Sequence, residues 1–214
     1  MLDLVYRVEK SRRKTISLLV REGKVIVRAP YGMADEAIGR FVREHEKWIA
    51  SKLFDAEKIS SKFCAVKEGR SLLIDGIEHA LVLGARRNRE ENGVVYLKNL
   101  KSMHGFFEKT RSFLLVEKTA LLSKSVGLFP NDVAVRDFKA RWGSCDAEHA
   151  IKLNWRLSML PTDLQEYVIV HELCHIAHLD HSPAFWREVE KVLPDQAARK
   201  KRLKEFSFLT LLYR

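Results

Sequence analysis

Two histidines and a glutamate near residue 170 have the types and spacing of a hydrolytic metal site. His171, Glu172 and His175 form the pattern H-E-x-x-H. Residues four apart lie on one face of an α-helix, so both imidazoles can reach the same metal ion. Glu172 lies about 100° around the helix from His171, where it can take a proton from water activated by the metal. The pattern therefore predicts metal-dependent hydrolysis with Glu172 as general base.

A catalytic zinc site needs a third protein ligand beside an open position. His178 and His181 both follow the motif. On a straight helix His178 would lie about 10 Å along the axis from His171, whereas Zn–N bonds are only about 2 Å long. Ser182-Pro183 is typical of a new helix start, so we expect a bend near Leu179-Asp180. Such a bend can return a side chain to the metal, which favours His181 over His178 as the third ligand.

The segment around the motif predicts a buried helix. From Leu164 to Leu179 the chain is apolar nearly all round, which is typical of a helix inside a core. Buried imidazoles cannot remain without partners, and a metal ion would provide one. At the start of this helix, Thr162 and Gln165 have the spacing of a capping box.

A second helix is expected beyond the bend, over residues 183–193, followed by a basic helix that starts at Pro194-Asp195. Phe185 and Trp186 lie in the first of these helices. We expect the two aromatic side chains to brace the bend that presents His181.

The segment before the metal helix predicts two strands, over residues 132–139 and 150–157, joined by a turn at R-W-G-S-C-D. Arg141 in this turn could bind a carboxylate or phosphate, or stabilise an oxyanion, and Trp142 could form a wall of the site. The alternative is that Gly143 only permits the turn while Trp142 packs in the core. Two polar residues of the second strand are weaker candidates for the same cleft: Asn154 and Arg156.

Together these motifs resemble one known family. H-E-x-x-H, His181-Ser182-Pro183-x-Phe185-Trp186 and the upstream segment 141–145 occur in the order found in the YgjP-like metal-dependent hydrolases. That family is grouped with the zincin metallopeptidases and is related more distantly to the SprT and WSS-type proteases. The resemblance covers most of the chain. It implies a zincin-like fold, one catalytic Zn²⁺ held by the three histidines His171, His175 and His181, and Glu172 as catalytic acid/base.

The resemblance leaves two substrate classes open, because members are described as metallopeptidases while a bacterial branch is described as a UTP pyrophosphatase. We expect a zinc-dependent metallopeptidase that acts on a peptide or protein. A nucleotide substrate is the alternative, although the sequence has neither a P-loop nor a carboxylate cluster for Mg²⁺.

The expected class is α+β, with a β-rich region over residues 1–100 and a zincin-like domain over 101–214, which can pack as one unit. The strands expected in the first region are residues 2–8, 15–20, 24–28, 71–74, 77–83 and 94–97. An amphipathic helix is expected over residues 35–54, with His45 at its core boundary, and Ser60-Ser61 reads as a weak linker. Another helix is expected over 102–126, ending at Gly127.

The composition is that of an ordinary globular protein, with 46% hydrophobic and 31% charged residues. Apolar runs stay below the roughly 20 residues that a membrane span needs, so no membrane partner is expected. The first residues lack the pattern of a signal peptide. Three cysteines at wide spacing argue against a disulfide framework and favour a cytoplasmic location.

The net charge of +10 favours an anionic partner such as a nucleotide or nucleic acid. The basic clusters are scattered along the chain, and each alone is best explained as solvated surface: Arg12-Arg13-Lys14, Arg86-Arg87-x-Arg89 and 199–204. A third hypothesis is a basic nucleic-acid-associated protein with a structural zinc. It requires a fourth protein ligand, and Cys174 lies roughly 60° away from the histidine stripe, which disfavours it.

Overall fold

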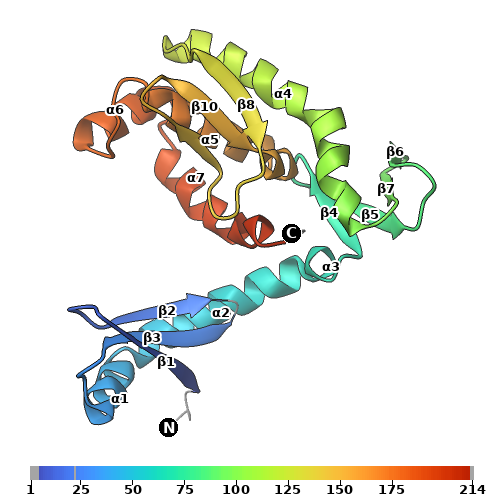
Figure 1. The fold of residues 1–214 in the computed structure, drawn as a ribbon. Coiled ribbons are helices and arrows are strands. Elements are labelled where there is room, and N and C mark those ends of the chain that lie inside the picture. Colours follow the sequence, from blue (N-terminus) through green and yellow to red (C-terminus); the bar gives the residue numbers. More distant parts are fainter. Residues whose placement is uncertain (1–4, 22, 213–214) are drawn as a thin grey trace. The chain divides into compact units, whose positions relative to one another are not determined.

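The computed structural model describes residues 5–21 and 23–212, and the chain forms two compact units, Met1–Cys64 and Ala65–Arg214 (Figure 1). The described residues combine helices with three small sheets, which confirms the α+β class. The units divide between residues 64 and 65, whereas the sequence predicted a division near residue 100. The boundary differs because the sheet formed by residues 71–97 is bonded to residues 158 and 159 of the second unit.

The first unit is a three-stranded sheet covered on one face by two helices (Figure 1). Its strands are β1 (Tyr6–Ser11), β2 (Ser17–Arg21) and β3 (Lys24–Pro30). β3 lies in the middle, parallel to β1 and antiparallel to β2. Val25, Val27 and Ala29 of β3 are buried against the helices. Because side chains alternate along a strand, the residues between them point to the opposite face. Residues 2–4 of the first expected strand lie outside the described residues.

The expected helix over 35–54 is two helices, α1 (Asp35–Glu44) and α2 (Glu46–Lys62), so that prediction was wrong in its bounds. The helices meet at His45, whose φ of −107° is not helical. The His45 ring is half-buried, and its Nδ1 lies 2.8 Å from the carbonyl oxygen of Phe41. α2 continues through the expected linker at residues 60–61.

The second sheet follows the short helix α3 (Cys64–Lys67) and has the strand order β4-β5-β7-β6. Its strands are β4 (Ser71–Ile74), β5 (Ile77–Leu83), β6 (Arg89–Glu91) and β7 (Val94–Leu97). The expected turn at Asp75-Gly76 joins β4 to β5, and both of its residues have positive φ. Its two backbone N–H groups donate to the carbonyls of Ser158 and Met159, at 2.9 and 3.2 Å. The sheet is thereby attached to the segment before the metal helix, and it belongs to the second unit.

The third sheet packs with helices α4 (Met103–Val126) and α5 (Thr162–Cys174), and its strand order is β8-β10-β9. The elements between β7 and α5 are η1 (Leu100–Ser102), α4 (Met103–Val126), β8 (Asp132–Arg136), β9 (Gly143–Cys145), β10 (Ala150–Asn154) and η2 (Trp155–Met159). β8 and β10 pair with each other, but they run parallel, so the antiparallel hairpin expected from these two strands was wrong. The hairpin that precedes the metal helix is formed by β9 and β10, which are antiparallel.

Helix α5 (Thr162–Cys174) carries the H-E-x-x-H motif and is buried nearly all round, as predicted. It ends at Cys174, so the expected continuation to Leu179 was wrong, and Leu179 is exposed. The expected capping box is absent from this helix: Pro161 is the N-cap residue and no side chain caps it. Gln165 instead donates to Asp75 and to the carbonyl of Leu160, each at 2.8 Å, and accepts from Lys118 at 2.7 Å. Gln165 therefore ties the metal helix to β4–β5 and α4.

Three elements follow α5: α6 (Pro183–Val192), α7 (Gln196–Leu203) and η3 (Lys204–Thr210). α6 starts as predicted, with Ser182 as N-cap and Pro183 in the first turn. Among the described residues, no helix combines the length and the apolar character required to cross a membrane.

Candidate metal centre

Three histidines converge at the end of α5. His171 lies on the helix, His175 is its C-cap residue, and His181 lies in the loop before α6. Their candidate ligand atoms all lie within 4.8 Å of one another. The Nε2 atoms of His171 and His181 are 3.1 Å apart. His178 and Cys174 are not members of this group. The bend expected near Leu179-Asp180 therefore brings His181, not His178, to the other two imidazoles.

The separation of the His171 and His181 nitrogens fits two ligands of a tetrahedral metal ion. Two nitrogens bonded at about 2.05 Å to a tetrahedral Zn²⁺ lie about 3.3 Å apart, close to the separation of His171 and His181. Nδ1 of His175 lies 2.9 Å from the carbonyl oxygen of His178. A carbonyl can only accept, so Nδ1 carries the proton and Nε2 is left with a free lone pair. Nδ1 of His171 is buried with no hydrogen-bond partner in the described part of the chain.

The electrostatics of the site keep the imidazoles of His171 and His175 neutral, which is the form that binds a metal. Burial, followed by the proximity of His175, His181 and Lys200, lowers the pKa of His171 to about 3. Burial also lowers the pKa of His175, against the opposing effect of its hydrogen bond to His178.

Two aromatic residues of α6 pack against the histidines, as the sequence predicted. The Phe185 ring stacks on His175 with centroids 4.5 Å apart, and the Trp186 ring stacks on His181 at 5.7 Å. The ammonium of Lys200 lies 4.1 Å from the centroid of the Trp186 ring. These contacts restrict the rotation of the imidazoles in the loop.

Glu172, which directly follows His171 in the chain, is a buried carboxyl group and only 6% exposed. Burial raises its pKa to about 7, while the charge of Arg141 and the backbone N–H of Cys145 act in the opposite direction. Strand β9 runs across this side chain. A Cβ atom on Gly143 would lie 2.8 Å from both Cγ and Oε1 of Glu172. The absence of a side chain at residue 143 therefore lets β9 approach the carboxylate.

Asn154, which is fully buried, forms hydrogen bonds to the loop that carries Arg141. Its Nδ2 donates to the carbonyls of Phe138 and Arg141 at 3.0 and 2.8 Å, and its backbone N–H donates to the carbonyl of Trp142 at 2.8 Å. The Arg141 guanidinium is exposed and lies 5.3 Å from the Phe138 ring centroid. The loop thus presents a cation near Glu172.

Arg156 is buried and holds the start of the same loop. It forms an ion pair with Asp137, which also accepts from the indole N–H of Trp155 at 3.1 Å. Its guanidinium donates to the carbonyl of Leu212 at 3.1 Å. Asn154 and Arg156 were weaker candidates for lining the cleft. In the structure both are buried: the Asn154 amide bonds to the backbone of the loop, and the Arg156 guanidinium pairs with Asp137.

Three contributors to the site were not identified from the sequence. Gly143 was recognised only as a turn residue, and the backbone N–H of Cys145 leaves no signature in a sequence. Lys200 is one cation in a basic helix, and nothing in that run distinguishes it from its neighbours.

The chain is similar to known metallopeptidases. The family model of the YgjP-like metallopeptidase domain matches residues 14–206. A crystal structure of the metallopeptidase zymogen abylysin from Pyrococcus abyssi shares 25% identity over 42% of this chain and 90% of that chain, with a TM-score of 0.39. Among curated proteins, no match was found. Since the family model spans nearly the whole chain, the protein belongs to the YgjP-like metallopeptidase family.

Proposed function

We propose that this chain is a zinc-dependent peptidase in which His171, His175 and His181 hold one Zn²⁺ and Glu172 is the general base. The observation that carries the proposal is the convergence of three imidazoles at the end of α5, with the buried Glu172 directly after the first of them in the chain. A zinc ion in this position would supply Lewis acidity, which lowers the pKa of a water molecule and polarises a peptide carbonyl.

Glu172 moves the proton in this scheme. Its pKa of about 7 lets the carboxylate accept a proton from water and return it to the leaving amine nitrogen near neutral pH. The N–H of Cys145 and the close approach of Gly143 fix the direction in which the carboxylate points. Proton transfer requires the carboxylate to be held within about 0.5 Å of its productive position.

The peptide substrate would bind along β9. β9 is an edge strand, so its outer backbone groups, apart from the Cys145 N–H that bonds to Glu172, would pair with an extended chain. Arg141 extends from the residues just before this strand and would bind a substrate carboxylate or stabilise the developing oxyanion. We assign Trp142 to the wall of the same cleft.

The test compares the wild type with Glu172→Gln and His171→Ala, using zinc analysis and an unfolded protein as substrate. We expect Glu172→Gln to retain zinc and lose turnover by at least about 10³-fold, and His171→Ala to lose the zinc. Near wild-type turnover in Glu172→Gln would refute the role of this glutamate. UTP serves as a second substrate: hydrolysis of UTP that Glu172→Gln abolishes, with no cleavage of protein, would assign the site to nucleotides.

A further inference from the structure

The open face of the first unit gathers basic residues that are scattered in the sequence. In the strand register, Arg7 of β1 lies opposite Ile26, and Arg21 of β2 lies opposite Lys24. These residues alternate with the side chains that pack on α1 and α2, so they share the face that the helices leave open. We call the basic face the set formed by Arg7, Arg21, Lys24 and Arg28, together with Glu9, Ser17, Leu19 and Ile26.

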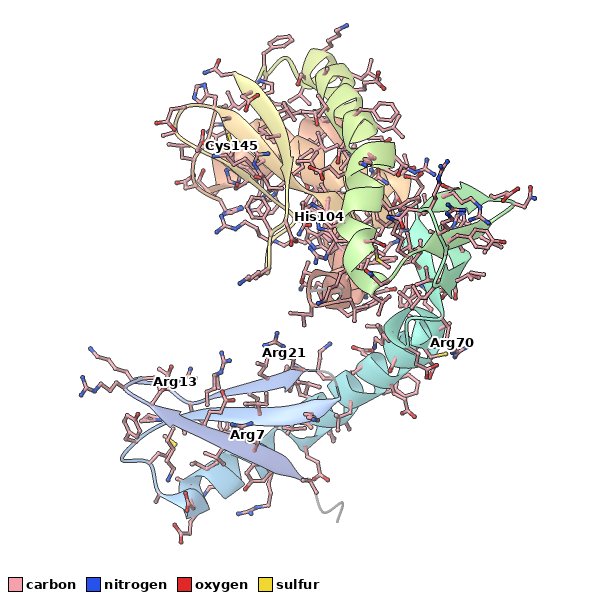
Figure 2. The ribbon with its side chains drawn as sticks, turned by 45° about the vertical axis from the view of Figure 1, so that its right-hand side comes forward. Arg7, Arg13, Arg21, Arg70, His104 and Cys145 are labelled. Atoms are coloured by element: carbon pink, nitrogen blue, oxygen red, sulfur yellow. The ribbon has the colours of Figure 1, made fainter. Side chains whose placement is uncertain are left out.

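The cations of the basic face are exposed and largely free of acidic partners. Arg28 donates to Glu9 at 3.2 Å. Within the described residues, no ion pair forms at Arg7, Arg21 or Lys24. The connection between β1 and β2 carries the cluster at residues 12–14. Figure 2 shows Arg13 at one end of the sheet, Arg21 at the other end of β2, and Arg7 between them.

The charge of the first unit is segregated to the sheet. Residues 1–34 contain eight basic and three acidic residues, whereas residues 35–62, which form α1 and α2, contain six of each. Solvated surface of the ordinary kind mixes both signs, as the two helices do. A concentration of one sign on an open sheet face produces a positive potential that attracts polyanions.

We propose that the basic face binds the phosphate backbone of nucleic acid. Lys24 and Arg28 are four residues apart on β3, about 13 Å along the strand. Over that length one strand of a duplex presents about four phosphates. The centre of the face is aliphatic, formed by Leu19 and Ile26, and its described residues include no aromatic ring for base stacking. Recognition is therefore of the backbone charge and is independent of sequence.

Binding is measured with the full-length protein and a fluorescein-labelled 20-base-pair DNA duplex, by anisotropy, from about 50 to 300 mM salt. Neutralisation of four phosphates gives a slope of log K against log salt of about −3.6, at about −0.9 per phosphate. The double variant Arg7→Gln/Lys24→Gln should lower the magnitude of this slope by about 1.8 and weaken binding about tenfold or more at 100 mM salt.

The matched control is Lys47→Gln/Lys58→Gln, which removes the same charge from exposed positions of α2 in the same unit. This control should keep the wild-type affinity and slope. If it weakens binding as much as the face variant, the attraction is due to net charge and the proposal is wrong. A wild type that fails to bind the duplex, or that binds anionic lipid vesicles instead, also overturns it.

Thermal unfolding of each variant separates loss of binding from loss of folding. A second face variant, Arg21→Gln/Arg28→Gln, repeats the test if the first one unfolds. Zinc removal should leave duplex binding unchanged, because the basic face includes no residue of the metal centre. The result is therefore independent of the proposed peptidase activity.

Discussion

Gly143 and Glu172 are in such close contact that any side chain at residue 143 would occupy the space of the carboxylate. The ideal Cβ position lies 2.8 Å from Oε1 and Cγ of Glu172, and 3.0 Å from Cδ. Carbon atoms do not approach one another this closely, so either the strand or the glutamate would have to move. The absence of a side chain at Gly143 is therefore required for the observed position of the Glu172 carboxylate, the proposed general base.

Substitution of Gly143 by alanine should displace the Glu172 carboxylate and reduce kcat by about 10²-fold, because a displacement of about 1 Å has effects of that size. Zinc content should stay at the wild-type level, since the histidines are not touched. Steady-state kinetics and elemental analysis measure the two quantities. Gly105→Ala on α4 is the matched control, because a Cβ at that position meets nothing within 4 Å. Full activity in Gly143→Ala would contradict the assigned role.

His181→Ala should weaken zinc binding by several orders of magnitude, whereas His178→Ala should retain it. The difference follows from the geometry: the His181 ring belongs to the imidazole group, while His178 contributes its backbone carbonyl to His175. Chelator competition gives the two zinc dissociation constants. Equal loss in both variants would mean that the His178 ring, not its carbonyl, supports the site.

Asn154→Ala should cost about 2–4 kcal/mol of stability, because it leaves two carbonyls of the Arg141 loop without a donor. KM should rise while zinc is retained, since the loop that carries Arg141 loses its anchor. Denaturant unfolding and kinetics provide the readouts. Asn131→Ala removes a similar side-chain bond, to the carbonyl of Glu148, at an exposed site and should change stability by less than about 0.5 kcal/mol.

The stability of the wild type should fall more steeply in acid than that of Asp137→Asn. Burial alone would raise the pKa of Asp137, but the hydrogen bond and charge of Arg156 outweigh it and lower the pKa. A carboxylate with a lowered pKa contributes stability above its unfolded pKa of about 3.9, and this contribution is lost as the pH falls through the folded value. Melting temperatures at pH 6 and pH 3 for both proteins test this. Identical pH profiles would show that the ion pair contributes nothing.

Helix α5 and the approach of His181 to its two histidines could be predicted because the signals are local. A continuous apolar pattern specifies a buried helix around His171, and Ser182-Pro183 specifies where the next helix begins. Three histidines at the resulting spacing have little freedom to diverge. Local signals were sufficient in the same way for the turn at Asp75-Gly76 and for the helix that ends at Val126.

The features that were predicted wrongly depend on contacts between distant residues. Gln165 does not cap its own helix because Asp75 and Lys118 provide partners for its amide group. The strands expected as a hairpin run parallel because a further strand, β9, lies between them in the sequence. β9 reverses the chain once more and pairs with the other edge of β10. The boundary between units is displaced because the turn after β4 bonds to Ser158 and Met159. None of these partners can be recognised from one segment alone.

The hydrogen bond between His175 and the carbonyl of His178 makes the number of residues from His175 to His181 critical for the position of both imidazoles. Insertion or deletion of one residue there would shift the carbonyl, the ring that it orients and the next imidazole together. Chains with this centre should therefore tolerate changes of residue type at Ile176, Ala177 and Leu179 far better than changes in their number.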